Sequence, residues 1–331
     1  MRSGGGCGEV SNRVLAFLTR RVALMIPILL LVSIIAFSLI HLIPGDPALV
    51  ILGPEAPRET VEALRKQLGL DRPLVVQYAA WLGSALQGDL GRSLVDRQPV
   101  RKLIGQRLPA TLELAALTFL LAITIAVPIG IYTSVRRGGV ADWIGSVAAL
   151  AGQSIPHFWL GIMLIMLFSL QWKLLPASGY VPIWVNWKAN LLSLILPAFA
   201  TGAREAAVTT RYLRASLLEV LKQDYVRTAK AKGLAEWVVI LRHAVRNALI
   251  PVITASGLQI AALLGGLVIT ETIFTIPGFG RLIVDAIFQR DIPVVQGAVL
   301  FAAFMVMTVN LVIDIIYSAV DPRIKLSGGR G

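Results

Sequence analysis

The residues best placed to do chemistry in this sequence are charged side chains inside apolar segments. Arg204 and Glu205 interrupt an apolar run that starts near residue 189, and His157 follows a proline inside another run. Charge within a membrane is costly and usually marks a functional position, so all three are candidates for the lining of a pathway or gate. The alternative is that Arg204 and Glu205 form an interfacial pair that reaches water near a helix end.

Bond-making chemistry has little support. The sequence contains no Gly-x-x-x-x-Gly-Lys-[Ser/Thr], His-Glu-x-x-His or Gly-x-Ser-x-Gly motif. Its histidines, at 41, 157 and 243, are scattered over different segments, whereas a metal site needs converging ligands. The single cysteine, Cys7, excludes an intramolecular disulfide and a cysteine-cluster metal site. We therefore predict that the chain is not an enzyme and binds no metal or cofactor.

The composition is that of a membrane protein. The 331 residues are 56% hydrophobic and 15% charged, with a mean hydropathy of +0.74. Soluble domains are about 45–50% apolar and about 25% charged. The net charge of +12 would suggest nucleic acid in a soluble protein. In so apolar a chain, basic cytoplasmic loops explain it better, and we expect no nucleic-acid partner.

Six apolar runs approach or exceed the roughly 20 residues that a membrane-crossing helix needs. They predict an all-α integral membrane fold with spans at about 22–43, 110–133, 143–170, 190–212, 248–271 and 293–317. The third run is too long for one straight crossing, and Pro156 near its middle predicts a kinked or tilted helix rather than two short ones. Most basic residues of the short loops fall on one side, which places both termini in the cytoplasm.

The remaining segments are a cytoplasmic leader (1–21), an external insertion (44–108) after the first span, and a cytoplasmic tail (319–331); residues 109–318 form the main membrane domain. The insertion starts with a rigid turn, Pro44 to Pro47, and should contain helices over Arg58–Leu70 and Gln77–Leu86 that end at Gly69 and Gly88. We interpret it as a folded cap, which is compatible with a docking surface for an external partner.

The cytoplasmic segment 213–246 is the most informative. Asp224 is a candidate N-cap and Gly233 a candidate terminator, which predicts a short helix across the cytoplasmic mouth. Small residues on one face and cations on the other suit insertion into a groove of another protein. A basic loop attracted to anionic lipid fits equally well, and the residues alone do not decide.

Three acidic residues lie near span ends. We expect Glu113, Glu271 and Asp314 to anchor their helices at the membrane interface. Pro277-Gly-Phe-Gly280 should form a tight external turn.

Nine segments along the chain resemble, in order, type I permeases of ATP-binding-cassette (ABC) importers. Within these, the chain is similar to the subunit of the dipeptide/oligopeptide, nickel and glutathione family that carries a large external N-terminal insertion. The segments are Leu42–Pro47, Leu68–Pro73 with Gln77, Tyr78 and Trp81, Gly88–Ser93, Leu108–Leu114, Ser154–Trp159, Leu175–Gly179, Asp224–Gly233, Glu271–Arg281 and Asp321–Ile324.

The resemblance implies a type I permease fold and a coupling helix that contacts an ATPase. The coupling residues would be Asp224, Tyr225, Arg227, Thr228, Ala229, Lys230, Ala231, Lys232, Gly233 and Leu234. The sequence departs from the broad motif because Arg227 stands where an acid is usual and Thr228 where an alanine is usual. This leaves open which side chain makes the main contact with the ATPase.

The implied partners are a second homologous permease subunit, two ATPase subunits that bind ATP and magnesium, an external solute-binding protein and the lipid of a bacterial inner membrane. The implied cargo is small peptides, with a nickel complex or glutathione as alternatives. A secondary transporter or channel is the rival class. It is disfavoured because the sequence shows no internal repeat and no acid near the middle of a span.

Overall fold

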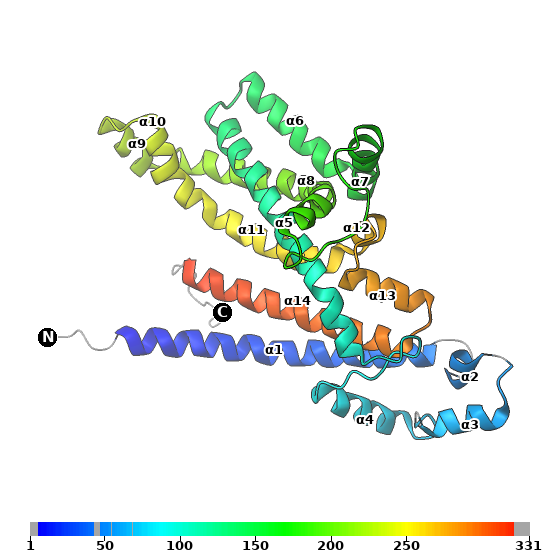
Figure 1. Ribbon diagram of the computed structural model, residues 1–331. Coiled ribbons are helices and arrows are strands. Elements are labelled where there is room, and N and C mark those ends of the chain that lie inside the picture. The colour runs from blue at the N-terminus through cyan, green and yellow to red at the C-terminus, as the bar shows by residue number, and fades with distance from the viewer. Residues whose placement is uncertain (1–5, 43–46, 54, 68, 321–331) are drawn as a thin grey trace. The chain divides into compact units, whose positions relative to one another are not determined.

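The computed structural model describes residues 6–42, 47–53, 55–67 and 69–320, which are almost entirely helical (Figure 1). The first residues of the predicted leader, most of the turn that opens the insertion, and the tail from residue 321 lie outside this range. In the described part, extended pairing is limited to one isolated bridge between Arg92 and Pro99. The chain divides into two compact units, residues 1–109 with 281–311, and residues 110–280 with 312–331.

The described helices account for six candidate membrane spans. Five are single helices of sufficient length and hydropathy, and a sharply bent pair of helices supplies the sixth. The five are Thr19–Leu39, Val100–Val135, Trp187–Val220, Glu236–Gly265 and Ile292–Ile316, and the pair is Val140–Ser154 with His157–Gln171. The prediction of an all-α membrane fold is confirmed, and the described helices supply the six predicted spans if the bent pair is one span.

The first unit contains the N-terminal helices and the chain segment before the last span. Its elements are α1 (Gly6–Leu42), α2 (Pro47–Leu52), α3 (Arg58–Gln67), α4 (Leu74–Leu86), the start of α5 (Val100–Val135), α13 (Phe279–Phe288) and the first part of α14 (Ile292–Val320). Both predicted insertion helices are present, as α3 and α4. Gly69 and Gly88 follow them with φ of +65° and +82°, a backbone region that suits glycine after a helix.

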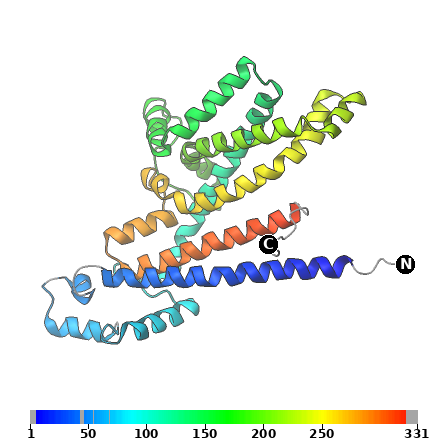
Figure 2. The same ribbon diagram turned by 180° about the vertical axis from the view of Figure 1, so that it is seen from behind.

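Helices α1, α4 and α14 pack together in this unit. The α1 and α14 helices run side by side in both views (Figures 1 and 2), and Gln296 Nε2 donates to the Phe37 carbonyl oxygen at 3.3 Å. On α4, the Tyr78 hydroxyl lies 2.7 Å from the Ser33 hydroxyl, and its ring packs edge-on against that of Phe37. The second insertion helix is therefore attached along the first span.

Asp291 closes the insertion onto the segment before α14. Its carboxylate accepts hydrogen bonds from the Ser93 hydroxyl and from the backbone N–H groups of Leu94 (3.1 Å) and Val95 (3.4 Å). The residue is almost fully buried, so these donors replace the water that the charge loses.

The second unit is built around the long helix α8. Its elements are the rest of α5, α6 (Val140–Ser154), α7 (His157–Leu164), the π-helix η1 (Ile165–Gln171), α8 (Trp187–Val220), α9 (Asp224–Ala231), α10 (Glu236–Val238), the π-helix η2 (Val239–Val245), α11 (Arg246–Gly266), α12 (Val268–Ile273) and the end of α14. Small residues on α8 face its neighbours. A Cβ on Gly202 would lie 3.1 Å from the Thr118 carbonyl oxygen of α5, which shows how closely the two backbones approach.

The third span differs from its prediction. It is not one kinked helix but two helices whose axes differ by 98°, broken at Ile155 and Pro156. Proline disfavours the α conformation in the residue before it, and Ile155 (ψ 123°) and Pro156 (ψ 129°) are both extended. Two successive extended residues redirect the chain, whereas a kink would have kept helical dihedral angles.

Glu271 also differs from its prediction, because it is fully buried rather than an interface anchor. The Thr111 hydroxyl of α5 donates to Glu271 Oε1 at 2.6 Å, and the Phe279 N–H donates to Thr111 Oγ1 at 2.7 Å. The turn at 277–280 wraps this carboxylate: a Cβ on Gly278 would lie 2.1 Å from Glu271 Cδ. Glycine is required there because no side chain fits between the turn and the carboxylate.

Candidate coupling site

Helix α9 lies between the end of α8 and the start of the fifth span. The α8 helix ends at Val220, two turn residues follow, and α9 runs from Asp224 to Ala231. Gln223, with extended dihedral angles, is the N-cap, so the prediction of Asp224 as N-cap is wrong by one position. An acid in the first turn still favours the helix through its dipole. Gly233 follows the C-cap with φ of +76°, as expected for a residue that ends a helix.

One face of α9 is buried against its own chain. Val226 (0% exposed) and Ala229 (7%) pack with Val239 of η2, and Val220 and Leu221 at the end of α8 cover the same cluster. In addition, Asn247 Nδ2 donates to the Tyr225 hydroxyl at 2.8 Å, which links α9 to the first turn of α11. Among the ten predicted coupling residues, Ala229 therefore serves packing, and Tyr225 both packs and is partly exposed.

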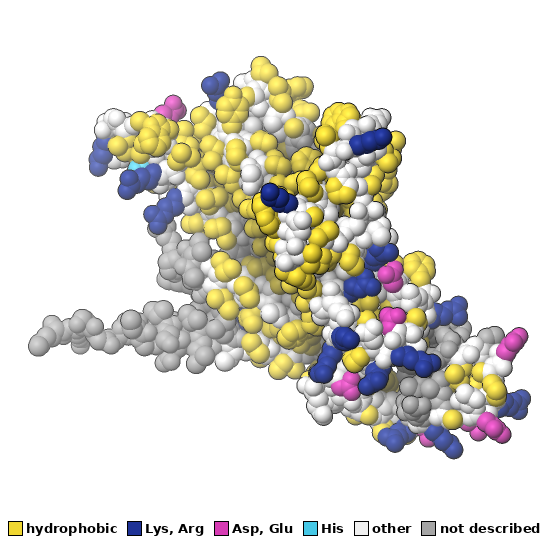
Figure 3. Space-filling model, in the orientation of Figure 1, with side chains coloured by type: hydrophobic (Ala, Val, Ile, Leu, Met, Phe, Trp, Pro, Cys, Tyr) yellow, Lys and Arg dark blue, Asp and Glu magenta, His cyan; other side chains and the backbone are white. Residues whose placement is uncertain are grey.

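The other face of α9 is solvated and basic. All the predicted coupling residues except Ala229 are exposed; the charged ones are Asp224, Arg227, Lys230 and Lys232. Figure 3 shows Lys and Arg side chains around the end of the molecule that α9 and α10 form. Arg227 and Asp224 approach within 3.7 Å, but their side chains are 76% and 98% exposed, so this pair contributes little to stability. The basic face remains available to an external partner.

The helices that support α9, α8 and the η2–α11 segment, pack closely against each other. Leu213 and Leu217 of α8 are fully buried against Ile240, Ala244 and Val245 of η2, with Ala248 and Val252 of α11 extending the cluster. Residues Glu236–Gly265 form one candidate span, so the turn after α9 leads into a membrane helix. Side chains fill the space between α8, η2 and α11, so these helices are packed as one body beneath α9.

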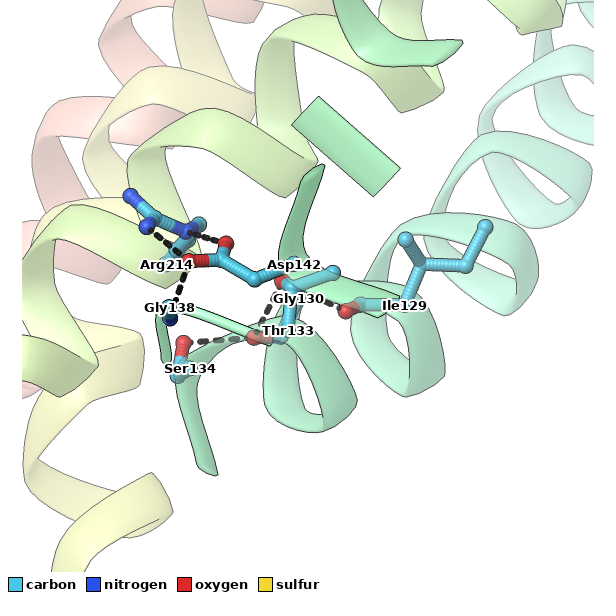
Figure 4. A network of polar contacts seen from close by, with 7 residues as sticks. All are labelled: Ile129, Gly130, Thr133, Ser134, Gly138, Asp142 and Arg214. Carbon is cyan, nitrogen blue, oxygen red and sulfur yellow. Dashed lines mark hydrogen bonds and ion pairs between the residues drawn. The ribbon is translucent and has the colours of Figure 1, made fainter. Parts of the chain in front are cut away.

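An ion pair that the sequence analysis did not single out ties a second loop to α8 (Figure 4). Arg214 donates from Nε to Asp142 Oδ1 at 2.8 Å and from its terminal NH2 to Oδ2 at 2.9 Å, and the Gly138 N–H donates to Oδ2 at 2.9 Å. The side chains are only 29% (Arg214) and 11% (Asp142) exposed, so the pair is largely shielded from solvent screening. The available signal was a lone acid after the basic residues Arg136 and Arg137.

A cavity of about 590 Å³ with a mixed polar and apolar lining adjoins this pair. It is lined by residues of α5, α6 and α8, including Thr133, Ser146 and Arg214. Arg211 donates to Gln153 Oε1 at 2.5 Å across the same helices. The Thr133 and Ser134 hydroxyls bond back to carbonyls of their own helix, as Figure 4 shows. The cavity thus lies between α6 and the part of α8 that leads into α9.

The three candidate pathway residues do not form one cluster of contacts. His157 begins α7 and is half-buried, Arg204 on α8 is exposed, and Glu205 next to it is half-buried. Among the residues that the structure describes, no hydrogen bond or ion pair joins their side chains. His157 Nε2 is buried and has no hydrogen-bond partner in that part of the chain. Their role in a pathway stays a prediction.

The helices long and apolar enough to cross a membrane define an integral membrane protein, and comparisons with known proteins identify its family. Residues 126–326 match the model of the binding-protein-dependent transport system inner membrane component, and residues 14–115 match the corresponding N-terminal model. The chain belongs to this family, and it is a multi-pass inner-membrane protein.

Relatives of known name agree over nearly the whole chain. The chain is 41% identical to the dipeptide transport system permease protein DppB of Escherichia coli and 41% identical to the glutathione transport system permease protein GsiC of the same species; each match covers 94% of this chain and 99% of the relative. A chain of the inward-facing MetNI methionine ABC transporter has a similar fold, with a TM-score of 0.56, 17% identity, and coverage of 66% of this chain and 96% of that one. The predicted family and permease fold are confirmed.

Proposed function

We propose that this chain is the permease subunit of an ATP-driven importer of small peptides, with both termini in the cytoplasm. The chain would pair with a second, homologous permease subunit, two ATPase subunits and an external solute-binding protein. ATP and magnesium would bind the ATPases, so this chain contributes no catalytic residue and holds no cofactor. The names of its relatives support peptide cargo.

The main support for the coupling role is that the two faces of α9 differ. Val226 and Ala229 on its apolar face are buried against the same chain, whereas its basic face is exposed to solvent. A loop that served only to attract anionic lipid would need no such fixed orientation. A helix docked rigidly on α8 and η2 can pass a push from a partner to both membrane helices, which is a rigid-body switch between two states.

The chemical step would take place in the ATPase, and this chain would convert its motion into a change of access. When the ATPase subunits close on ATP, they would draw the α9 helices of the two permeases together. Because short turns join α9 to α8 and to the fifth span, and α9 packs on both, these helices would move with it. The ligand that biases the two states is the nucleotide on the partner.

The test is transport by reconstituted vesicles with matched variants. Gly233→Pro cannot adopt a φ of +76°, and should abolish ATP-driven uptake while leaving membrane insertion intact. Charge reversal of Lys230 and Lys232 should do the same without altering the backbone. Gly265→Ala, where an added Cβ meets open space, is the control and should transport normally.

Normal uptake by the first two variants would contradict the coupling role. Uptake by vesicles that contain this chain without any ATPase subunit would contradict the whole proposal and favour a secondary transporter or channel. Copurification of ATPase subunits with the tagged chain is the corresponding direct measurement.

Glutathione is a second candidate cargo, because the glutathione permease GsiC matches this chain as well as the dipeptide permease does, at 41% identity. Selectivity in such systems should rest largely with the solute-binding protein. Separate uptake measurements with labelled dipeptide, labelled glutathione and a labelled nickel complex distinguish the three. Uptake of glutathione alone would reassign the cargo.

A further inference from the structure

An apolar groove in the first unit has the chemistry of a lipid site. It encloses about 710 Å³ between α1, α4 and α14, which is within the range of about 300–1,000 Å³ typical of small-molecule pockets. Ile26 and Leu30 of α1, Leu86 of α4, and Phe301 and Phe304 of α14 form much of its wall.

The groove has one available polar group, the guanidinium of Arg101. The only other polar side chain in its lining, Ser33, is buried and bonded to the Leu30 carbonyl oxygen (2.8 Å) and the Tyr78 hydroxyl (2.7 Å). Arg101 is exposed, and the described residues offer it no carboxylate partner. An occupant of this groove therefore meets apolar walls and a single unpaired cation.

The cation lies near one end of the groove. Arg101 is in the first turn of α5, and its neighbour Val100 packs against Gly297, where a Cβ would lie 2.8 Å from Val100 Cγ1. Phe304 is seven residues further along α14, which corresponds to about 10 Å of helix rise. The groove thus extends from the charge inward along two membrane spans, α1 and α14.

We propose that this groove binds one phospholipid, with an acyl chain along α1, α4 and α14 and the phosphate at Arg101. A phospholipid is the occupant that matches both features, an apolar chain and an anion at one end. A membrane helix of a partner subunit would fit the walls, but it would need a costly buried acid to satisfy Arg101. This inference does not depend on the cargo or on the ATPase.

The experiment measures phospholipid binding to the full-length chain with its copurifying subunits in mild detergent. After delipidation, the protein is titrated with phosphatidylglycerol and with diacylglycerol, which has the acyl chains but lacks the phosphate, and bound lipid is counted by native mass spectrometry. Arg101→Gln should weaken phosphatidylglycerol binding about fivefold, the effect of losing one basic contact at a membrane surface. Lys102→Gln, an exposed neighbour outside the groove, should bind as the wild type does.

Two further measurements keep the test independent of folding defects in the Arg101 variant. Ala85→Trp fills the groove from α4 and should prevent binding of both lipids, while diacylglycerol should bind Arg101→Gln and wild type equally. Unchanged phosphatidylglycerol affinity in either variant would overturn the proposal. Efficient crosslinking of Leu86→Cys (combined with Cys7→Ser) to a partner permease would also overturn it, because that subunit would then cover the groove.

Discussion

The Asp142–Arg214 ion pair should be required for efficient coupling, and its effect can be estimated from its geometry. Asp142→Asn keeps the shape of the side chain but leaves the Arg214 guanidinium, 29% exposed, without its counterion. Breaking a buried pair costs about 3–5 kcal/mol and breaking an exposed one about 0–1 kcal/mol. This pair is bidentate and mostly shielded, so we expect a loss of about 2 kcal/mol.

The functional consequence follows from what the pair connects. It fixes the start of α6 to α8 at Arg214, which lies between Leu213 and Leu217 of the cluster that α8 forms with η2 and α11. Without it, α9 and α8 can respond to the ATPase while α6 lags behind. We expect Asp142→Asn to keep ATP hydrolysis and to lower the amount of solute transported per ATP.

The assay combines thermal unfolding of the purified complex with parallel measurements of hydrolysis and uptake in vesicles. The exchange Asp142→Arg with Arg214→Asp should recover part of the loss, but not all of it, because arginine offers the Gly138 N–H no acceptor. Asp285→Asn removes a longer, single-contact i,i+4 pair with Arg281 (3.6 Å), both partly exposed, and should cost at most about 0.5 kcal/mol. An unchanged melting temperature together with unchanged uptake per ATP in Asp142→Asn would refute the reasoning.

Two other predictions concern the turn around Glu271 and the topology. Gly278→Ala should destabilise the protein by about 1–3 kcal/mol, since its Cβ would overlap the Glu271 carboxyl group. Gly105→Ala, in open space within α5, should not lower the melting temperature, and equal stability of the two variants would contradict the packing. An alkaline-phosphatase fusion after Gln87 should be active and one after Lys222 inactive in whole cells, and the opposite pattern would place the termini on the other side of the membrane.

The spans were predictable because hydrophobicity is a local property of the chain. The angle within the third span was not predictable, because Pro156 indicates an irregularity in the helix but does not determine how large it is. The same proline is compatible with a kink and with a break. They differ in the conformation of Ile155, which is extended here and therefore ends the helix.

Glu271 was misjudged for a different reason. Its position in sequence, near the end of an apolar run, is also that of an interface anchor. Its burial depends on Thr111, which lies 160 residues away, and on glycines that leave room for the carboxylate. The Asp142–Arg214 pair has the same character: both charges were visible in the sequence, but their meeting depends on how α6 packs on α8.

For the candidate coupling helix α9, the structure separates the buried residues of the motif from the exposed ones. The sequence marked ten residues as a group and could not say which of them face a partner. Val226 and Ala229 pack against their own chain, so an ATPase that docked on α9 would contact its basic face. Arg227, which replaces the usual acid, is 76% exposed and only weakly paired with Asp224 at 3.7 Å. An arginine can form a bidentate pair with a carboxylate, so the departure from the motif is consistent with a partner surface that is acidic at this position.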